Sequence, residues 1–186
     1  MTLTAEAKTS EPYATRLAPE TVRLERLLPG PVDRVWTWII DSEKRAKWFA
    51  GGPIVLQDGG DATLTFRNSD LSGGLNASGH QVAGDGVDHV MRGIVTRCEP
   101  PHVLAFNWNH DGTGSESQFE LSAEGDDTRL VITHRRLSSH KQLLGVSAGW
   151  HTHVGILIDL LSQEAPRSFW PEHGRLEKVY AERFGG

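Results

Sequence analysis

His134 is the polar residue that the sequence places best for chemistry inside a folded core. It follows Leu130 and Ile132 at intervals of two in a segment whose alternation is typical of a strand with one buried face. The imidazole is therefore expected to point toward the apolar side of a sheet. With an ordinary pKa of about 6.5, it could orient a ligand carbonyl or act as an acid or base. The alternative is a structural histidine whose nitrogens are satisfied within the core.

His151 and His153 form a His-x-His pair, which on a strand would turn both rings to one side and suit a metal. Their surroundings have helical spacing, and residues two apart on a helix point about 200° away from each other. The two rings are not expected to share a ligand, and neither a Cys cluster nor a His-x-x-x-His pattern accompanies them. We expect no bound metal. Turn chemistry, not a calcium loop, explains the aspartates near glycines, which are Asp58, Asp61, Asp85 and Asp88.

Cys98 is the single cysteine, which excludes an internal disulfide and a cysteine-built metal site. It could be a nucleophile, but no neighbour in the sequence would stabilise its thiolate, so we expect a structural cysteine. The sequence has no Gly-x-Ser-x-Gly elbow, no phosphate-binding glycine-rich loop and no dinucleotide fingerprint. Hydrolase, kinase and dehydrogenase functions therefore lack their residues, and no cofactor is expected.

The composition is that of an ordinary globular protein. The 186 residues carry a net charge of −5 without a long basic run, so nucleic acid is not expected as a partner. No apolar stretch approaches the roughly 18 to 20 residues that span a membrane, and the polar first 20 residues contain no signal-peptide core. We expect a cytoplasmic protein without a membrane partner.

The elements that must position His134 follow from hydrophobic periodicity. Residues 21–28 alternate as a strand, and two short helices are expected at 31–41 and 43–49. Further strands follow between turns, and they indicate an antiparallel meander with one apolar face: 53–57, 61–67, 89–98, 102–109, 115–122 and 128–136. The glycine-rich segment 68–88 is expected as a mobile loop at one end of the sheet. Apolar residues at steps of three and four predict a long helix at 143–161 that lies across the sheet.

Several local patterns occur in the order found in one superfamily. They are PVDRVW at 31–36, KWF at 47–49, GIV at 93–95, EPP at 99–101, LAFNW at 104–108, TRLVITH at 128–134 and GW at 149–150. With them the chain resembles the START/SRPBCC superfamily, of the Bet v 1-like type, in its heat-shock ATPase activator homologue (Aha-like) branch. The resemblance covers residues 21–163. The loop 68–88 is longer than is usual for the branch, and a tail follows Pro166.

The resemblance implies a fold class of α+β with the helix-grip architecture. A curved antiparallel sheet of about six to seven strands wraps on a long C-terminal helix, and two short helices follow the first strand. Residues 1–20 are then a flexible N-terminal arm, 21–164 the helix-grip domain and 165–186 a C-terminal amphipathic tail.

In this superfamily the gap between sheet and helix is an apolar cavity, so the resemblance implies one here. The expected ligand-binding lining is Trp48, Phe49, Phe66, Phe106, Trp108, His134, Trp150 and Val154. The alternative is that these large side chains only fill the core.

Three functions are compatible with this fold. The first is non-catalytic binding of an apolar small molecule, either a lipid or an aromatic metabolite, with His134 orienting it. The second is a cyclase or hydrolase in the same cavity, which would need a second polar group from Asp41, His110 or His151. The third is a stress-related, co-chaperone-like interaction module. The co-chaperones of the branch carry a separate N-terminal domain, and the segment before Thr21 is too short to hold one, so this function is the least expected.

The tail repeats Leu176, Val179, Tyr180 and Phe184 at steps of three or four residues. So short a helix cannot bury these side chains alone. Either the domain itself covers them or a second subunit does so in a symmetric homodimer. Intramolecular docking is favoured because the tail is tethered a few residues past the long helix.

Overall fold

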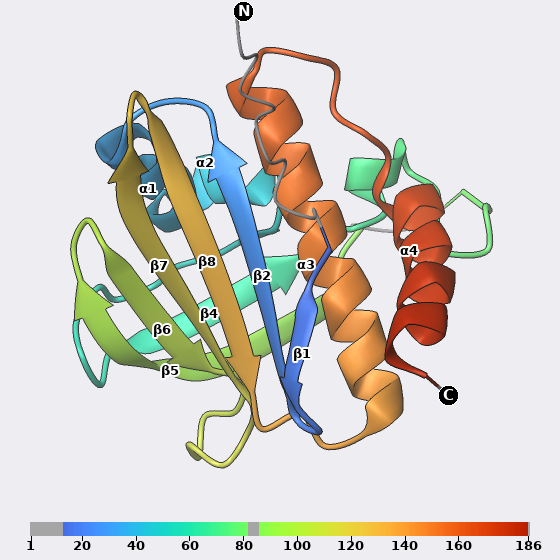
Figure 1. Ribbon diagram of the computed structural model, residues 1–186, viewed down its shortest axis with the longest axis horizontal. Coiled ribbons are helices and arrows are strands. Elements are labelled where there is room, and N and C mark those ends of the chain that lie inside the picture. Colours follow the sequence, from blue (N-terminus) through green and yellow to red (C-terminus); the bar gives the residue numbers. More distant parts are fainter. Residues whose placement is uncertain (1–12, 82–85, 186) are drawn as a thin grey trace, which may run out of the picture.

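The computed structural model describes residues 13–81 and 86–185 and forms one curved sheet that wraps around a long helix (Figure 1). Its eight strands pair antiparallel in the order β1-β2-β8-β7-β6-β5-β4-β3. The strands are β1 Thr15–Ala18, β2 Thr21–Leu28, β3 Ala50–Gly51, β4 Asp61–Phe66, β5 His89–Glu99, β6 Val103–Asn107, β7 Glu116–Glu124 and β8 Asp127–Arg135. The helices are α1 Val32–Ile40, α2 Ser42–Ala46, the single-turn η1 Asp70–Ser72, α3 His140–Leu161 and α4 Phe169–Phe184. The α+β helix-grip fold is confirmed.

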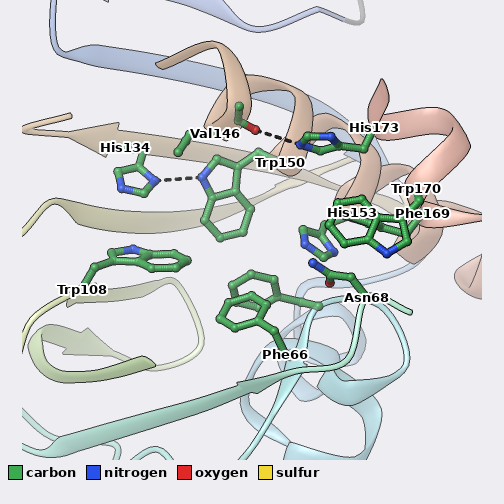
Figure 2. Close-up of a pocket in the computed structure, with 13 residues that line it drawn as sticks. Phe66, Asn68, Trp108, His134, Val146, Trp150, His153, Phe169, Trp170 and His173 are labelled. Carbon is green, nitrogen blue, oxygen red and sulfur yellow. Dashed lines mark hydrogen bonds between the residues drawn. The ribbon is translucent and has the colours of Figure 1, made fainter. Parts of the chain in front are cut away.

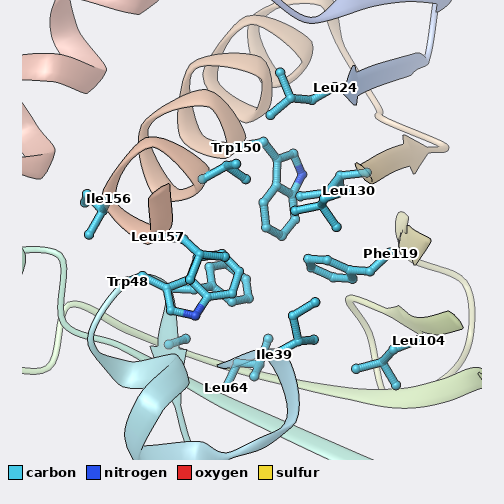
Figure 3. Packing of buried hydrophobic residues seen from close by; sticks show 14 of the residues in the cluster. Leu24, Ile39, Trp48, Leu64, Leu104, Phe119, Leu130, Trp150, Ile156 and Leu157 are labelled. Carbon is cyan, nitrogen blue, oxygen red and sulfur yellow. The ribbon is translucent and has the colours of Figure 1, made fainter. Parts of the chain in front are cut away.

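The long helix α3 supplies one side of the core. Ser139 begins it as an N-cap, its hydroxyl accepting a hydrogen bond from the backbone N–H of Gln142. Trp150, Val154 and Leu157 are buried against the concave face of the sheet, as the spacing predicts. Figure 3 shows how Trp150 and Leu157 meet side chains of the sheet and of the short helices. The helix therefore closes the apolar face of the meander, which could not remain in water.

The short helices differ in one respect from the expectation. Asp41 caps α2 through the backbone N–H of Lys44, but the helix ends at Ala46 and does not reach Phe49. The chain turns there around Arg45, whose buried guanidinium donates hydrogen bonds to backbone carbonyls of four residues. Those residues are Ile39, Ile40, Ala50 and Gly52. This anchor carries Trp48 and Phe49 into the core.

The sheet has more strands than the six or seven expected. The additional strand β1 lies in the segment 1–20, which was expected as a flexible arm; that expectation is wrong for Thr15–Ala18, and residues 1–12 lie outside the described part. The strand expected at 53–57 is replaced by β3, which pairs with the end of β4, and by a single bridge between Ile54 and Ala62. Both β1 and β3 form because they pair with a neighbouring strand, since a strand at the edge of a sheet needs no apolar alternation of its own.

The expected amphipathic tail forms α4, which packs beside α3 on the side away from the sheet (Figure 1). Leu176 and Tyr180 are each 0% exposed, so the domain itself covers the tail's apolar face. The hydroxyl of Tyr180 accepts a hydrogen bond from the backbone N–H of Ala14 and also contacts His151 Nδ1 at 2.9 Å. Within the described residues, no helix combines the length and the apolar character needed to cross a membrane.

Candidate functional site

A cavity of about 300 Å³ lies between the sheet, α3, α4 and the segment that follows β4 (Figure 2). Its walls are mostly aromatic. It is lined by Phe49, Phe66, Asn68, Trp108, His134, Gly145, Val146, Gly149, Trp150, His153, Phe169, Trp170 and His173. The volume lies at the lower end of the range of small-molecule sites, roughly 300 to 1,000 Å³.

Five of the eight residues predicted for the lining do line this cavity: Phe49, Phe66, Trp108, His134 and Trp150. The other three, Trp48, Phe106 and Val154, are buried in the packed core instead. Phe106 stacks on Phe119 with ring centroids 5.9 Å apart. Trp48 donates its indole N–H to the carbonyl of Trp38. These three side chains therefore pack in the core and do not line the cavity.

Apart from the α3 glycines Gly145 and Gly149, six lining residues were absent from the predicted set: Asn68, Val146, His153, Phe169, Trp170 and His173. Two of them could have been found from sequence, because Val146 and His153 lie four before and three after Trp150 and so share its helix face. The others come from α4 and the 68–88 segment, whose positions depend on tertiary packing.

Two polar contacts place the α4 wall of the cavity. Arg167, just before α4, donates from Nε and Nη2 to the carboxylate of Asp159 on α3, at 2.8 and 2.7 Å. The backbone N–H of Trp170 donates to the hydroxyl of Ser72 in η1 at 2.9 Å. Phe169 and Trp170 are thereby held over α3.

The segment 68–88, which was expected as a mobile loop, is held by hydrogen bonds at its start. The backbone N–H and the hydroxyl of Ser69 both donate to the carboxylate of Asp88, at 2.9 and 2.8 Å. Ser69 is buried, and Asn68 beside it reaches the cavity. The segment 68–88 thus contributes a wall of the site, although residues 82–85 lie outside the described part.

His134 lies at one end of the cavity with both ring nitrogens engaged. The indole N–H of Trp150 donates to Nδ1 at 3.1 Å, so Nδ1 carries the lone pair. Nε2 then carries the proton and donates to the hydroxyl of Ser115 at 2.8 Å. Burial, with the charge of Arg136 as a second cause, lowers the pKa of His134 to about 3. The geometry favours a neutral, structural histidine.

His153 lies toward the other end and has one nitrogen engaged. Its Nδ1–H donates to the backbone carbonyl of Trp48 at 2.7 Å, so Nε2 carries the lone pair. Burial lowers the pKa of His153 to about 3, against the opposing effect of that hydrogen bond. In the described part of the chain, the hydrogen bond of the His153 ring is made by Nδ1, so Nε2 is free to accept one.

Two other polar atoms at this end lack partners. Oδ1 of Asn68 and Nε1 of Trp170 are buried without a hydrogen bond. Figure 2 shows Asn68, His153, Phe169 and Trp170 grouped at one end, and Trp108 with His134 at the other. Here His173 Nε2 lies 3.3 Å from the carbonyl of Gly145. Among the described residues, the hydrogen-bonding groups at the His134 end of the cavity are therefore paired, whereas some at the His153 end have no partner.

The other residues weighed for chemistry lie elsewhere. Asp41 caps α2, and the side chain of His110 is 66% exposed, 3.5 Å from Asp61. His151 contacts Tyr180 under α4 while His153 points into the cavity, so the pair diverges as the helical spacing predicts. Burial and then the nearby Asp58 raise the pKa of Cys98, which favours the thiol over the thiolate. Across residues 13–81 and 86–185, no group of three His, Cys, Asp or Glu side chains is arranged to hold a metal.

Known proteins place this geometry in context. A Bordetella parapertussis protein encoded by BPP1335, solved by NMR, is 38% identical, with a TM-score of 0.74 over 93% of this chain and 91% of its own. CalU16 from Micromonospora echinospora is 23% identical, with a TM-score of 0.64 over 89% of each chain. DynU16, from the dynemicin biosynthetic locus, is 22% identical with a TM-score of 0.62; 82% of this chain matches 51% of DynU16. At the identities of CalU16 and DynU16, the likeness shows the fold alone.

Among curated proteins, no sequence matches this one. Residues 29–162, by contrast, match the family described as Activator of Hsp90 ATPase homolog 1-like protein. That match runs from the turn before α1 to the end of α3, and so includes most of the sheet and the α3 wall of the cavity. The chain therefore belongs to the Activator of Hsp90 ATPase homolog 1-like family, the Aha-like branch of the START/SRPBCC superfamily.

Proposed function

We propose that this protein binds an apolar small molecule, a lipid or an aromatic metabolite, in the cavity between the sheet, α3 and α4, without transforming it. The observation that carries the proposal is the wall itself. Phe49, Phe66, Trp108, Trp150 and Phe169 surround a space of about 300 Å³, and no Lys or Arg lies among the described lining residues. Aromatic walls of this kind favour apolar ligands through burial and ring stacking.

Binding without reaction is favoured because the candidate acid–base residues His134, Asp41, His110 and His151 do not converge on one point of the cavity. A cyclase or hydrolase needs at least two such groups around a reacting atom. The nitrogens of His134 are engaged by Trp150 and Ser115, and Asp41, His110 and His151 lie outside the cavity. Among the described lining residues, His153 has a free lone pair on Nε2, but a base with a pKa of about 3 is a weak one at neutral pH.

The proposed setting is the cytoplasm, with neither nucleic acid nor membrane as partner. It is supported by the net charge of −5 and by the lack of a described helix that could span a membrane. A homodimer through the tail is not needed to cover Leu176 and Tyr180, because α3 already does so.

The test uses naphthalene as an apolar probe and two matched variants. Gly149 lies on α3 in the cavity wall, and a Cβ added there meets no atom within 4 Å. Gly149→Leu should fill the cavity, weaken naphthalene binding at least about tenfold, and leave the melting temperature equal or higher, since Leu is the better helix former. Gly174→Leu is the control, because Gly174 lies on α4 outside the cavity and has equally open space.

Ligand-observed NMR and tryptophan fluorescence measure the affinities, and native mass spectrometry of the freshly purified protein reports a co-purifying molecule. Equal naphthalene binding by the native protein and Gly149→Leu would overturn the proposed site. Failure of naphthalene to bind the native protein at all would overturn the proposed apolar ligand class.

A further inference from the structure

The two ends of the cavity differ in hydrogen-bonding capacity, and this difference restricts the ligand. At the His134 end the protein's own groups are already paired, with Trp150 and Ser115 on His134, and Trp108 donating to Ser117 at 2.6 Å. At the His153 end, Asn68 Oδ1 and Trp170 Nε1 are buried without a hydrogen-bond partner in the described part of the chain. The hydrogen bond of the His153 ring is made by Nδ1, which leaves Nε2 without one among the described residues. Buried polar groups in native proteins are nearly always paired, so unpaired ones at a cavity indicate where a ligand's polar atom belongs.

His153 sets the chemical sense of that polar atom. Its Nδ1–H is committed to the carbonyl of Trp48 at 2.7 Å, and this contact also holds the ring orientation. Nε2 is therefore an acceptor, and burial keeps the ring neutral at ordinary pH by lowering its pKa. Only a hydrogen-bond donor can pair with it.

Trp170 and Asn68 set the second requirement. The indole N–H of Trp170 can only donate, and the Asn68 carboxamide can turn either its N–H₂ or its oxygen toward a ligand. A ligand hydroxyl can donate its one proton to Nε2 of His153 and accept from the indole N–H of Trp170. Asn68 joins them by turning its N–H₂ toward the same hydroxyl oxygen. A carboxylate could accept but not donate, would face the lone pair of His153, and would be buried without a Lys or Arg among the described lining residues.

We propose that the ligand is a neutral hydroxylated aromatic molecule whose hydroxyl lies at the α4 end of the cavity and donates to Nε2 of His153. The apolar rings then occupy the space between Phe66, Trp108 and Trp150 (Figure 2). This inference rests on the proposed function and adds the polar group and the orientation of the ligand.

Three probes of similar size test it on the full chain: naphthalene, naphthol and naphthoate. We expect naphthol to bind about three- to tenfold more tightly than naphthalene, the range of one neutral hydrogen bond, and naphthoate to bind more weakly than either. Naphthol and naphthalene of equal affinity would overturn the inference while leaving the proposed function intact. Naphthoate binding most tightly would overturn it as well, because the site would then select an anion.

His153→Asn tests the acceptor. The Asn amide N–H can still donate to the carbonyl of Trp48, but no atom replaces Nε2, so the advantage of naphthol over naphthalene should disappear while naphthalene still binds. Trp170→Phe should reduce the same advantage, and Trp38→Phe, on α1 away from the cavity, is its matched control. An advantage that survives in His153→Asn would show that the hydroxyl binds elsewhere.

A measurement on the native protein keeps the inference testable if His153→Asn does not fold. In protein labelled with ¹⁵N-histidine, the non-protonated Nε2 signal of His153 should move on addition of naphthol and stay nearly fixed with naphthalene. An equal response to both probes would contradict the hydrogen bond, since ring stacking alone would then account for it.

Discussion

The indole N–H of Trp150 donates a hydrogen bond to Nδ1 of His134 across 3.1 Å, and this contact joins the long helix α3 to strand β8. Trp150 therefore both lines the cavity and links α3 to the sheet. Because the bond determines which nitrogen of His134 holds the proton, it leaves the N–H on Nε2, which donates to Ser115.

Substitution of Trp150 should therefore lower the free energy of unfolding as well as change the wall of the cavity. Trp150→Ala is expected to lower the free energy of unfolding by about 3 to 5 kcal/mol, as for other buried aromatic residues. Trp150→Phe should lose only about 0.5 to 1.5 kcal/mol, because Nδ1 of His134 loses the indole donor but keeps the hydroxyl of Ser117 at 3.2 Å. Urea denaturation followed by circular dichroism measures both. A loss of less than about 1 kcal/mol for Trp150→Ala would mean that the indole lies in an open pocket rather than in packed core.

Three buried histidines should make stability depend on pH. The pKa values of His134, His151 and His153 are each lowered to about 3, mainly by burial. Their unfolded values are about 6.5, so below that pH the unfolded chain binds more protons than the folded one. Stability is then fully present above pH 6.5 or so and falls as the pH drops toward about 3, by at most about 1.4 kcal/mol per pH unit for each histidine.

Urea unfolding at a series of pH values measures that slope. His151 should contribute least, because part of its shift comes from Arg167 and Arg175, which are partly exposed and whose charges solvent screens. His153→Asn should reduce the slope by roughly one proton. A free energy of unfolding that stays constant between neutral pH and about pH 5 would contradict the depressed pKa values.

Arg26 on β2 should be a source of instability. Its Nε and Nη2 are buried without a hydrogen-bond partner, and burial lowers its pKa. Arg26→Met keeps the apolar stem and removes the unsatisfied guanidinium, so the free energy of unfolding should rise by about 1 to 3 kcal/mol. Arg23→Met on the same strand is the control, because Arg23 pairs with Glu25 at 2.6 Å in a half-exposed position. Thermal melts in which Arg26→Met is the less stable of the two would contradict this reasoning.

Removal of the tail tests whether α4 is part of the domain. Deletion of residues 169–186 takes away Leu176 and Tyr180, both fully buried, together with one wall of the cavity. We expect a lower melting temperature at unchanged mass by sedimentation, and loss of naphthalene binding. The milder Leu176→Ala should cost about 2 to 5 kcal/mol. A dimer that falls to monomer on deletion would instead assign the tail to a subunit interface.

Much of the fold follows from local sequence, for physical reasons that particular elements illustrate. Helical spacing over 143–161 can bury only one face, so α3 had to lie on an apolar surface, and the alternating segments offered that surface in a sheet. Pro31 and Asp41 mark the starts of α1 and α2 because each suits the first turn of a helix. Strand β1 escaped prediction, since Thr15–Ala18 owes its conformation to pairing with β2.

The residues of the candidate site likewise fall into those that the sequence predicts and those that only tertiary contacts bring together. Strand and helix periods placed Phe66, Trp108, His134 and Trp150 each on the apolar face of its own element, because these periods follow from backbone geometry. The family resemblance is what predicted that these faces would meet around one cavity, and the four residues do line it. Only the tertiary structure decided that Phe169, Trp170 and Asn68 would complete the cavity, since their positions depend on contacts between segments far apart in the chain, such as Trp170 with Ser72. It also decided that His134 is satisfied and His153 is not, because a hydrogen-bond partner is a matter of distance in space, which no local pattern specifies.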